Sequence, residues 1–189
     1  MIPVATLTTE RLVLRDWRDE DLPAFRSLNL DREVRRYFPG LLMPYESDAS
    51  ATRIRHFLSE NGWGLWAVEE RGGAPFLGFV GLNRPGFAPF THSVEIGWRL
   101  SRNAWGHGYA TEAARAALAH GFTALGLDEI VAFTVPTNVP SRRVMDRLSM
   151  VQDEAGTFEH PRIDEGHPLR THVLYRLSHE RWSQSLRHP

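Results

Sequence analysis

The sequence predicts an α+β fold in which one mixed sheet carries helices on both faces. The expected order of elements is strand, two or three helices, three strands, helix, strand, helix and two strands. A strictly alternating, doubly wound fold is excluded because several expected strands follow one another directly. No repeat, low-complexity segment or long linker interrupts the 189 residues, so we expect a single domain over residues 1–189.

Strands are predicted where apolar residues alternate or run together between turn residues. Leu12 and Leu14 mark the first strand, and Arg71-Gly72-Gly73 predicts a hairpin turn between the second and the third. The later strands are expected, in order, over 65–70, 76–82, 93–100, 130–135, 150–155 and 171–177. A helix between 93–100 and 130–135 makes these two strands a parallel crossover pair.

Helices are predicted from apolar residues three and four apart and from capping residues. Asp19 is the expected N-cap of a helix that ends near Leu30, and Ser47 or Asp48 is expected to begin another. Ser178 is expected to cap a short terminal helix. The other helices are expected over 31–38, 108–125 and 138–148.

Composition and charge exclude several classes of protein. The formal net charge is −1 and the basic residues are scattered, so a nucleic-acid partner is not expected. No apolar run approaches the ~20 residues of a membrane span, and the N-terminal residues do not resemble a signal peptide. We therefore expect a cytoplasmic protein with no membrane partner.

The chain contains no cysteine, which excludes disulfides, thiolate metal sites and a cysteine nucleophile. Three late histidines, His160, His167 and His172, invite a metal interpretation. Their spacings of seven and five fit no pair of ligands on one helix, so no metal is expected.

A glycine-containing segment, Trp-Gly-His-Gly-Tyr-Ala-Thr-Glu-Ala at 105–113, joins the strand at 93–100 to an Ala-rich helix. Because Gly106 and Gly108 have no side chain, main-chain N–H groups can approach an anion, and the helix N-terminus adds a favourable dipole. The segment is not a P-loop, and Thr111 stands where a dinucleotide fingerprint needs its third glycine. It predicts a site for a pyrophosphate-bearing cofactor, with an ordinary tight turn as the alternative.

Four segments of the chain carry a family resemblance. They are Thr-Glu-Arg-Leu-Val-Leu-Arg at 9–15, Glu-Ile-Gly-Trp-Arg-Leu at 95–100, the 105–113 segment, and Asn-Val-Pro-Ser-Arg-Arg-Val-Met at 138–145. The four segments follow one another in the order found in the GNAT superfamily of N-acetyltransferases, which the chain therefore resembles. Within that superfamily it resembles the ribosomal-protein N-terminal (RimJ/RimL-like) branch. One departure is Ser149, where the family commonly has glycine; in a left-handed conformation serine would cost about 1 kcal/mol.

The resemblance implies a GNAT-like, mostly antiparallel central sheet in which the parallel strands 93–100 and 130–135 splay apart and hold acetyl-CoA. The pantetheine arm would pair with the main chain of Trp98, Arg99 and Leu100. The pyrophosphate would rest on the N–H groups of Ala104, Trp105, Gly106, His107, Gly108, Tyr109 and Ala110.

Glu95 is the candidate general base, because a carboxylate buried near a cofactor has a raised pKa. An exposed acid on a solvated face is the alternative. By resemblance, Asn138 contacts the pantetheine arm and Ser141 donates a proton to the departing thiolate; N-capping of the helix is the alternative for both residues. Tyr109 is a rival donor for which a packing role is favoured.

The resemblance implies acetyl transfer from acetyl-CoA to a primary amine, either a protein N-terminus or a small molecule. Without a cysteine, we expect direct transfer in a ternary complex. A catalytically silent acetyl-CoA-binding sensor or interaction module is the alternative. The acceptor is expected to be recognised by loops at 31–47 and 153–170, and exposed sheet edges would allow a homodimer.

Overall fold

The computed structural model of the protein describes residues 2–187. Its strands form one sheet in the order β1-β2-β3-β4-β5-β6-β8-β7. Their bounds are β1 (Leu7–Thr8), β2 (Leu12–Arg15), β3 (Leu65–Glu70), β4 (Gly78–Asn83), β5 (Glu95–Leu100), β6 (Glu129–Thr134), β7 (Val151–Glu159) and β8 (Thr171–Ser178). The sheet is mostly antiparallel, with β5 and β6 parallel, which confirms the predicted fold class. Within residues 2–187, no helix has the length and apolar character needed to cross a membrane.

The chain forms two compact units. The first contains the residues up to Leu82 together with Gly97–Ala117, and the second contains Asn83–Ile96 and the residues from Leu118 onward. Strands β4 and β5 and helix α3 (Tyr109–Thr123) therefore contribute residues to both units. The expectation of a single domain stays a prediction.

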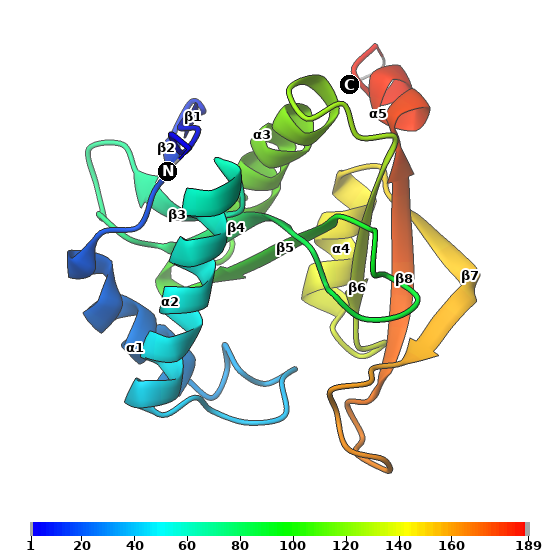
Figure 1. The fold of residues 1–189 in the computed structure, drawn as a ribbon, viewed down its shortest axis with the longest axis horizontal. Helices are drawn as coiled ribbons and strands as arrows, with labels where there is room; N and C mark the ends of the chain where they lie inside the picture. The colour runs from blue at the N-terminus through cyan, green and yellow to red at the C-terminus, as the bar shows by residue number, and fades with distance from the viewer. Residues whose placement is uncertain (1, 188–189) are drawn as a thin grey trace. The chain divides into compact units, whose positions relative to one another are not determined.

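Two helices of the first unit, α1 (Leu22–Leu30) and α2 (Pro44–Asn61), lie side by side (Figure 1). The prediction that Asp19 caps α1 is wrong, because a short 3-10 turn, η1 (Asp19–Asp21), precedes the helix. The carboxylate of Asp21 accepts a hydrogen bond from the backbone N–H of Arg18 at 2.8 Å.

The predicted helix over 31–38 is also wrong, because the segment forms a series of turns. Its backbone bonds include Arg35 N–H to the carbonyl of Asp31 at 3.0 Å and Phe38 N–H to that of Arg35 at 2.9 Å. Pro39 has no N–H group with which to continue such a series.

Helix α2 begins at Pro44, earlier than the predicted Ser47 or Asp48. Proline is favoured in the first turn of a helix because its fixed φ suits the helix and its missing N–H needs no partner. The carboxylate of Glu46 accepts a hydrogen bond from the N–H of Met43 at 2.7 Å, which satisfies one of the free donors at this end.

The second unit contains β6, β8 and β7 together with α4 (Val139–Arg147) and α5 (His179–Ser185). Strands β6 and β8 pair from Glu129↔Ser178 to Thr134↔Val173. Strand β7 extends to Glu159, beyond the predicted end at 155, so part of the expected late loop is strand. The Ser178 cap is confirmed, because its hydroxyl accepts a hydrogen bond from Arg181 N–H at 3.2 Å.

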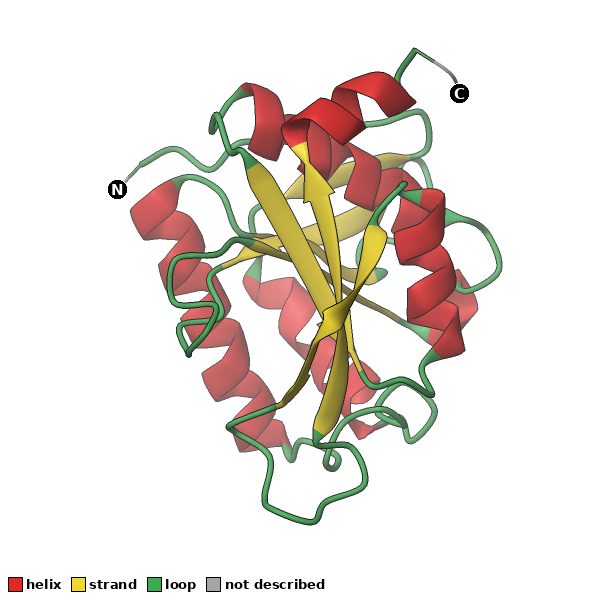
Figure 2. Ribbon diagram, turned by 90° about the vertical axis from the view of Figure 1, so that its right-hand side faces the viewer, coloured by secondary structure: helices red, strands yellow, loops and turns green. Residues whose placement is uncertain are grey.

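Each unit buries its own apolar residues. Leu12, Phe25 and Trp66 are fully buried in the first unit, as are Ile130 and Leu177 in the second. Burial of each such side chain stabilises the fold by about 1.5–3 kcal/mol. Figure 2 shows that the strands are twisted, as the right-handed preference of L-residues requires.

Candidate functional site

The glycine loop follows β5 and a short 3-10 turn, η2 (Arg102–Ala104), and leads into α3. Gly106 and Gly108 both have φ of 79°, in the left-handed region that glycine adopts most readily. A Cβ atom on Gly106 would meet nothing within 4 Å, and one on Gly108 would meet only a guanidinium nitrogen of Arg11, at 3.7 Å. The space above the loop is thus open, and the first N–H groups of α3 have no partner within the helix. An anion such as a pyrophosphate fits these donors.

Arg11 holds the glycine loop against the start of α3. Its Nη1 donates to the carbonyl of His107 at 3.0 Å, and its Nε donates to the Glu112 carboxylate at 2.7 Å. The hydroxyl of Thr9 donates to the same carboxylate at 2.6 Å. Arg11 and Thr9 belong to the 9–15 segment of the family resemblance, but no role was predicted for either residue.

Tyr109 and Trp105 are two aromatic residues of the glycine loop that form hydrogen bonds. The hydroxyl of Tyr109 donates a hydrogen bond to the Glu70 carboxylate, which raises the pKa of the phenol, and its ring stacks on His107 at 5.4 Å. Trp105 is 47% exposed, although its indole N–H is fixed by the carbonyl of Leu100 at 2.9 Å. The contacts of Tyr109 agree with the packing role favoured for it.

Strand β5 follows the alternation expected from its sequence. Val94, just before the strand, and Ile96 and Leu100 are buried, whereas Glu95 and Arg99 are partly exposed. Residues at alternate positions of a strand point to opposite faces, so Glu95 and Arg99 share one face.

Glu95 lies at the start of β5, in register with Val131 of the parallel strand β6. Burial raises the pKa of its carboxyl group to about 8, against the opposing effects of a hydrogen bond from Asn83 and the positive charge of Arg162. A carboxylate with this pKa is a much stronger base than an exposed one. The environment of Glu95 therefore supports the role of general base rather than that of an ordinary exposed acid.

Asn83 and Arg162 are functional candidates that were missed in the sequence. Asn83 is the last residue of β4, and Arg162 lies in the loop between β7 and β8. Nη2 of Arg162 donates to the carbonyl of Pro85 at 2.7 Å, and its guanidinium lies 5.3 Å from the ring centre of Phe87. No local pattern connects these residues to Glu95, because they meet only in the folded second unit.

Asn138 is the N-cap of α4, which is the alternative role that the sequence suggested for this residue. Its Oδ1 accepts a hydrogen bond from Ser141 N–H at 3.3 Å, and its Nδ2 donates to the hydroxyl of Thr134 at 2.9 Å. An amide side chain can make four hydrogen bonds, so capping leaves capacity for a further contact. The cofactor contact of Asn138 and the donor role of Ser141 stay predictions.

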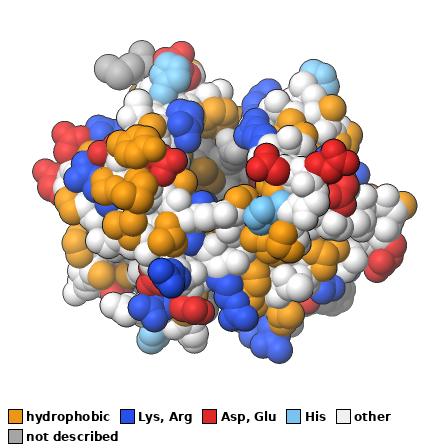
Figure 3. Space-filling model, turned by 90° about the horizontal axis from the view of Figure 1, so that it is seen from below, with side chains coloured by type: hydrophobic (Ala, Val, Ile, Leu, Met, Phe, Trp, Pro, Cys, Tyr) orange, Lys and Arg blue, Asp and Glu red, His pale blue; other side chains and the backbone are white. Residues whose placement is uncertain are grey.

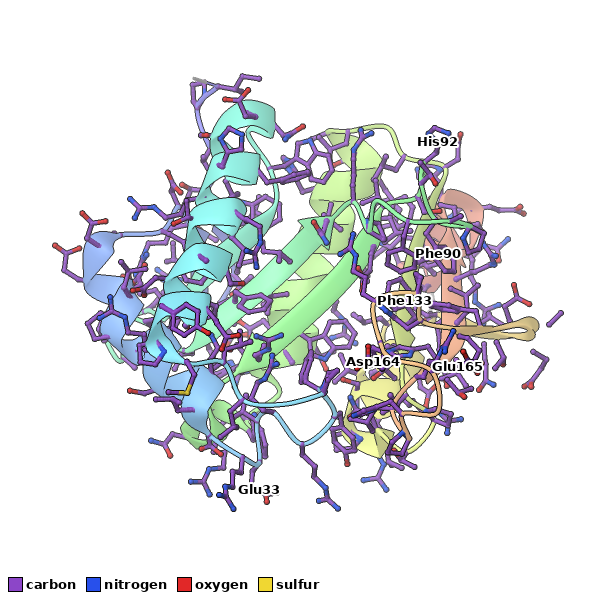
Figure 4. All side chains as sticks on the ribbon, turned by 60° about the horizontal axis from the view of Figure 1, so that its bottom comes forward. Glu33, Phe90, His92, Phe133, Asp164 and Glu165 are labelled. Atoms are coloured by element: carbon purple, nitrogen blue, oxygen red, sulfur yellow. The ribbon has the colours of Figure 1, made fainter. Side chains whose placement is uncertain are left out.

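An aromatic cluster fills part of the second unit. Phe90 and Phe133 stack at 5.3 Å and are labelled in Figure 4. His160 and His172 lie at its edge, with ring centres 4.9 Å apart, and burial is the largest of the effects that lower the pKa of His160 to about 4. Among the described residues, no group of three His, Cys, Asp or Glu side chains is placed to hold a metal.

Charged side chains of both signs are interspersed on the face drawn in Figure 3. The exposed acids Asp164 and Glu165 lie together on the loop between β7 and β8 (Figure 4). Arg142 donates a hydrogen bond to the hydroxyl of Tyr175 at 3.1 Å.

Comparisons with known proteins agree with this geometry. Residues 11–151 match the family described as "Acetyltransferase (GNAT) domain". The chain is 29% identical over 180 residues to YnaD of Bacillus subtilis, named an uncharacterized N-acetyltransferase, covering 94% of this chain and 99% of that protein.

Solved structures share the fold. A GNAT-family acetyltransferase from Bacillus anthracis superposes with a TM-score of 0.77 at 26% identity, covering 93% of this chain and 99% of that one. A ribosomal-protein-S5-alanine acetyltransferase from Vibrio fischeri superposes with a TM-score of 0.73 at 18% identity, covering 94% and 98% of the two chains.

Proposed function

The chain belongs to the acetyltransferase (GNAT) domain family and is an acetyl-CoA-dependent N-acetyltransferase, and we propose that it passes the acetyl group directly to a primary amine in a ternary complex. The observation that carries this proposal is Glu95, a partly buried carboxyl group whose pKa is raised to about 8 and to which Asn83 donates a hydrogen bond. The absence of cysteine supports direct transfer, because an acyl-cysteine intermediate is impossible.

Glu95 acts on the ammonium group of the acceptor. In its ionised form it removes a proton, directly or through one water, and the neutral amine then attacks the acetyl carbonyl. With a pKa of about 8, roughly a tenth of Glu95 is ionised at neutral pH. Asn83 orients the carboxylate, and the charge of Arg162 keeps its pKa from rising further.

Acetyl-CoA supplies an activated acyl group with a thiolate as the leaving group. The N–H groups of Gly106, His107, Gly108, Tyr109 and Ala110 would bind its pyrophosphate, which the open left-handed glycines permit. The N–H groups of Ala104 and Trp105, which the sequence also suggested, instead donate to the carbonyls of Ser101 and Arg102 at 2.9 and 3.0 Å. The main chain of Trp98, Arg99 and Leu100 would pair with the pantetheine arm. N–H groups of this strand would stabilise the charge that develops on the acetyl oxygen, and Ser141 would donate a proton to the thiolate.

Two acceptor classes follow from the four sequence segments that resemble the family. The RimJ/RimL-like branch acts on protein N-termini, and a small-molecule amine is the other class. The exposed acids Asp164 and Glu165 support a cationic acceptor, because negative surface charge attracts an ammonium group.

The test is thiol release from acetyl-CoA with a panel of peptide N-termini, amino acids and other amines, with mass detection of the acetylated product. We expect sequential kinetics with one class and a 10²–10⁴-fold lower kcat in Glu95→Gln. Parallel double-reciprocal plots would contradict direct transfer. Tight acetyl-CoA binding without turnover on any amine would favour the sensor alternative.

A further inference from the structure

Arg99, on β5, donates to a neutral amide side chain, whereas Arg15 and Arg26 of the same unit pair with carboxylates. Its Nη1 donates to the side-chain oxygen of Asn29 at 2.8 Å, and its guanidinium carbon lies 4.3 Å from the ring centre of Phe38 and 5.2 Å from that of Phe79. Its buried Nε has no hydrogen-bond partner within the described residues 2–187. The contacts of this cation thus include one neutral amide and two aromatic rings.

Arg35 brings a second positive charge to the same place. It is 8% exposed, its Nε donates to the carbonyl of Gly40 at 2.7 Å, and its guanidinium carbon lies 4.5 Å from the centre of the same Phe38 ring. The two guanidinium carbons are thus within 8.8 Å of each other, the sum of their distances from the shared ring centre. Among residues 2–187, neither guanidinium lies within 4.0 Å of a carboxylate oxygen.

The like charges disfavour each other. Burial and then the charge of Arg35 lower the pKa of Arg99 to about 9, and burial also lowers the pKa of Arg35, against the opposing charge of Glu46. A charge withdrawn from water is costly unless an opposite charge or full hydrogen bonding compensates for it.

Arg15 is a buried arginine of the same unit with a structural role, and its hydrogen bonds can be compared with those of Arg99. It is 6% exposed, and its Nη1 and Nη2 donate to the two oxygens of the Asp21 carboxylate at 2.8 and 2.9 Å. Its Nε donates to Glu69 at 2.6 Å. Arg15 thus pairs with two carboxylates, whereas among the described residues no carboxylate pairs with Arg99 or Arg35.

We propose that Arg99 and Arg35 bind an oxyanion, foremost a carboxylate, that is carried by the acceptor amine. This inference rests on the proposed function. A guanidinium presents donors in a planar fork that matches a carboxylate or a phosphate, and the flanking aromatic rings support that plane. The acceptor class is then an amine with an anionic group, such as an amino acid, rather than a polyamine.

The position of Arg99 assigns the anion to the acceptor and not to acetyl-CoA. Under the proposed function, the N–H groups of the glycine loop bind the pyrophosphate of acetyl-CoA. Arg99 instead lies on β5, the strand that begins at Glu95, and the alternation of this strand gives both residues the same face. Arg35 and Phe38 belong to the 31–47 segment that the sequence assigned to acceptor recognition.

The test compares ω-amino acids with the alkylamines of the same chain length, together with phosphoethanolamine and ethanolamine. We expect kcat/KM to be about 10–100-fold higher for the anionic member of each pair, as for a charge-assisted hydrogen-bonded contact. Preference in the first series identifies a carboxylate, and preference in the second identifies a phosphate. Arg99→Gln should abolish the preference, and Arg99→Lys should restore part of it.

Arg36→Gln is the matched control, because it removes a neighbouring but exposed arginine and should leave the preference unchanged. If Arg99→Gln does not fold, a competition experiment on the wild-type protein tests the anion site instead. Hexanoate should compete with the acceptor, and hexanamide should not. Equal turnover of anionic and neutral amines would overturn the anion site and leave the proposed function intact. Absence of turnover with every amine would overturn the proposed function, and calorimetry showing no hexanoate binding would independently overturn the anion site.

Discussion

Replacing Glu95 with glutamine should stabilise the folded protein at neutral and alkaline pH while it removes the base. The carboxyl group has an ordinary pKa of 4.5, and the fold raises this to about 8 through burial. Between these values the unfolded chain has lost the proton and the folded chain retains it. The free energy of unfolding therefore falls as pH rises through this window, by about 1.4 kcal/mol per pH unit.

The magnitude follows from the size of that window. The loss of stability is about 3 kcal/mol at pH 7 and about 5 kcal/mol once Glu95 is fully ionised above pH 8. Glutamine fills nearly the same volume, can hydrogen-bond to Asn83 and never ionises. We therefore expect the wild-type protein and Glu95→Gln to differ little near pH 4.5 and to diverge progressively up to about pH 8.

Urea denaturation of both proteins across this pH range measures the difference. Glu165→Gln is the control, because it removes an exposed carboxylate of the same unit. In parallel, kcat/KM of the wild-type enzyme should rise with pH and level off above about 8. If the stability difference between wild type and Glu95→Gln is the same at both ends of the range, Glu95 titrates as an exposed acid and the argument for its role as base fails.

Three further changes test the end of α4, the glycine loop and the N-cap of α4. Ser149 has φ of 62°, so Ser149→Gly should raise the free energy of unfolding by about 1 kcal/mol in denaturation experiments; no gain would show that this conformation is not strained. Gly106→Ala should cost about 1 kcal/mol and raise the KM for acetyl-CoA, whereas Gly126→Ala, also left-handed and open, should cost the same stability with KM unchanged. Asn138→Ala should lose about 1 kcal/mol with its cap, and a higher KM for acetyl-CoA than in the cap control Ser178→Ala would support a cofactor contact.

Local sequence signals predicted those elements that are determined locally. The alternation around Glu95 marks β5, and Ser178 caps α5, because strand periodicity and capping depend on residues close in the chain. Asp19 failed as a cap because Asp21, held by Arg15, organises that turn instead. This contact joins two elements, and propensity alone does not show it.

The candidate site was predictable to a similar extent. The glycine loop and Glu95 could be identified because they lie within segments that carry the family resemblance. Asn83 and Arg162, which influence the pKa of Glu95, come from the end of a strand and from a variable loop with no shared pattern. The neighbours of the Arg99 guanidinium likewise come from distant segments of the chain. A single arginine in a predicted strand therefore does not indicate that no carboxylate will lie beside it.

The exposed indole of Trp105 makes the glycine loop observable without a label. Trp17, Trp63 and Trp66 are buried, so their fluorescence should change little when a ligand arrives at the surface. Trp98 and Trp182 are partly exposed, so replacing both with phenylalanine isolates the signal of Trp105. Trp105 is 47% exposed yet anchored through its N–H to the carbonyl of Leu100. Its emission should shift to shorter wavelength, and become less accessible to a soluble quencher, when acetyl-CoA covers the loop. The protein thus carries a spectroscopic reporter beside the donors that are expected to bind pyrophosphate.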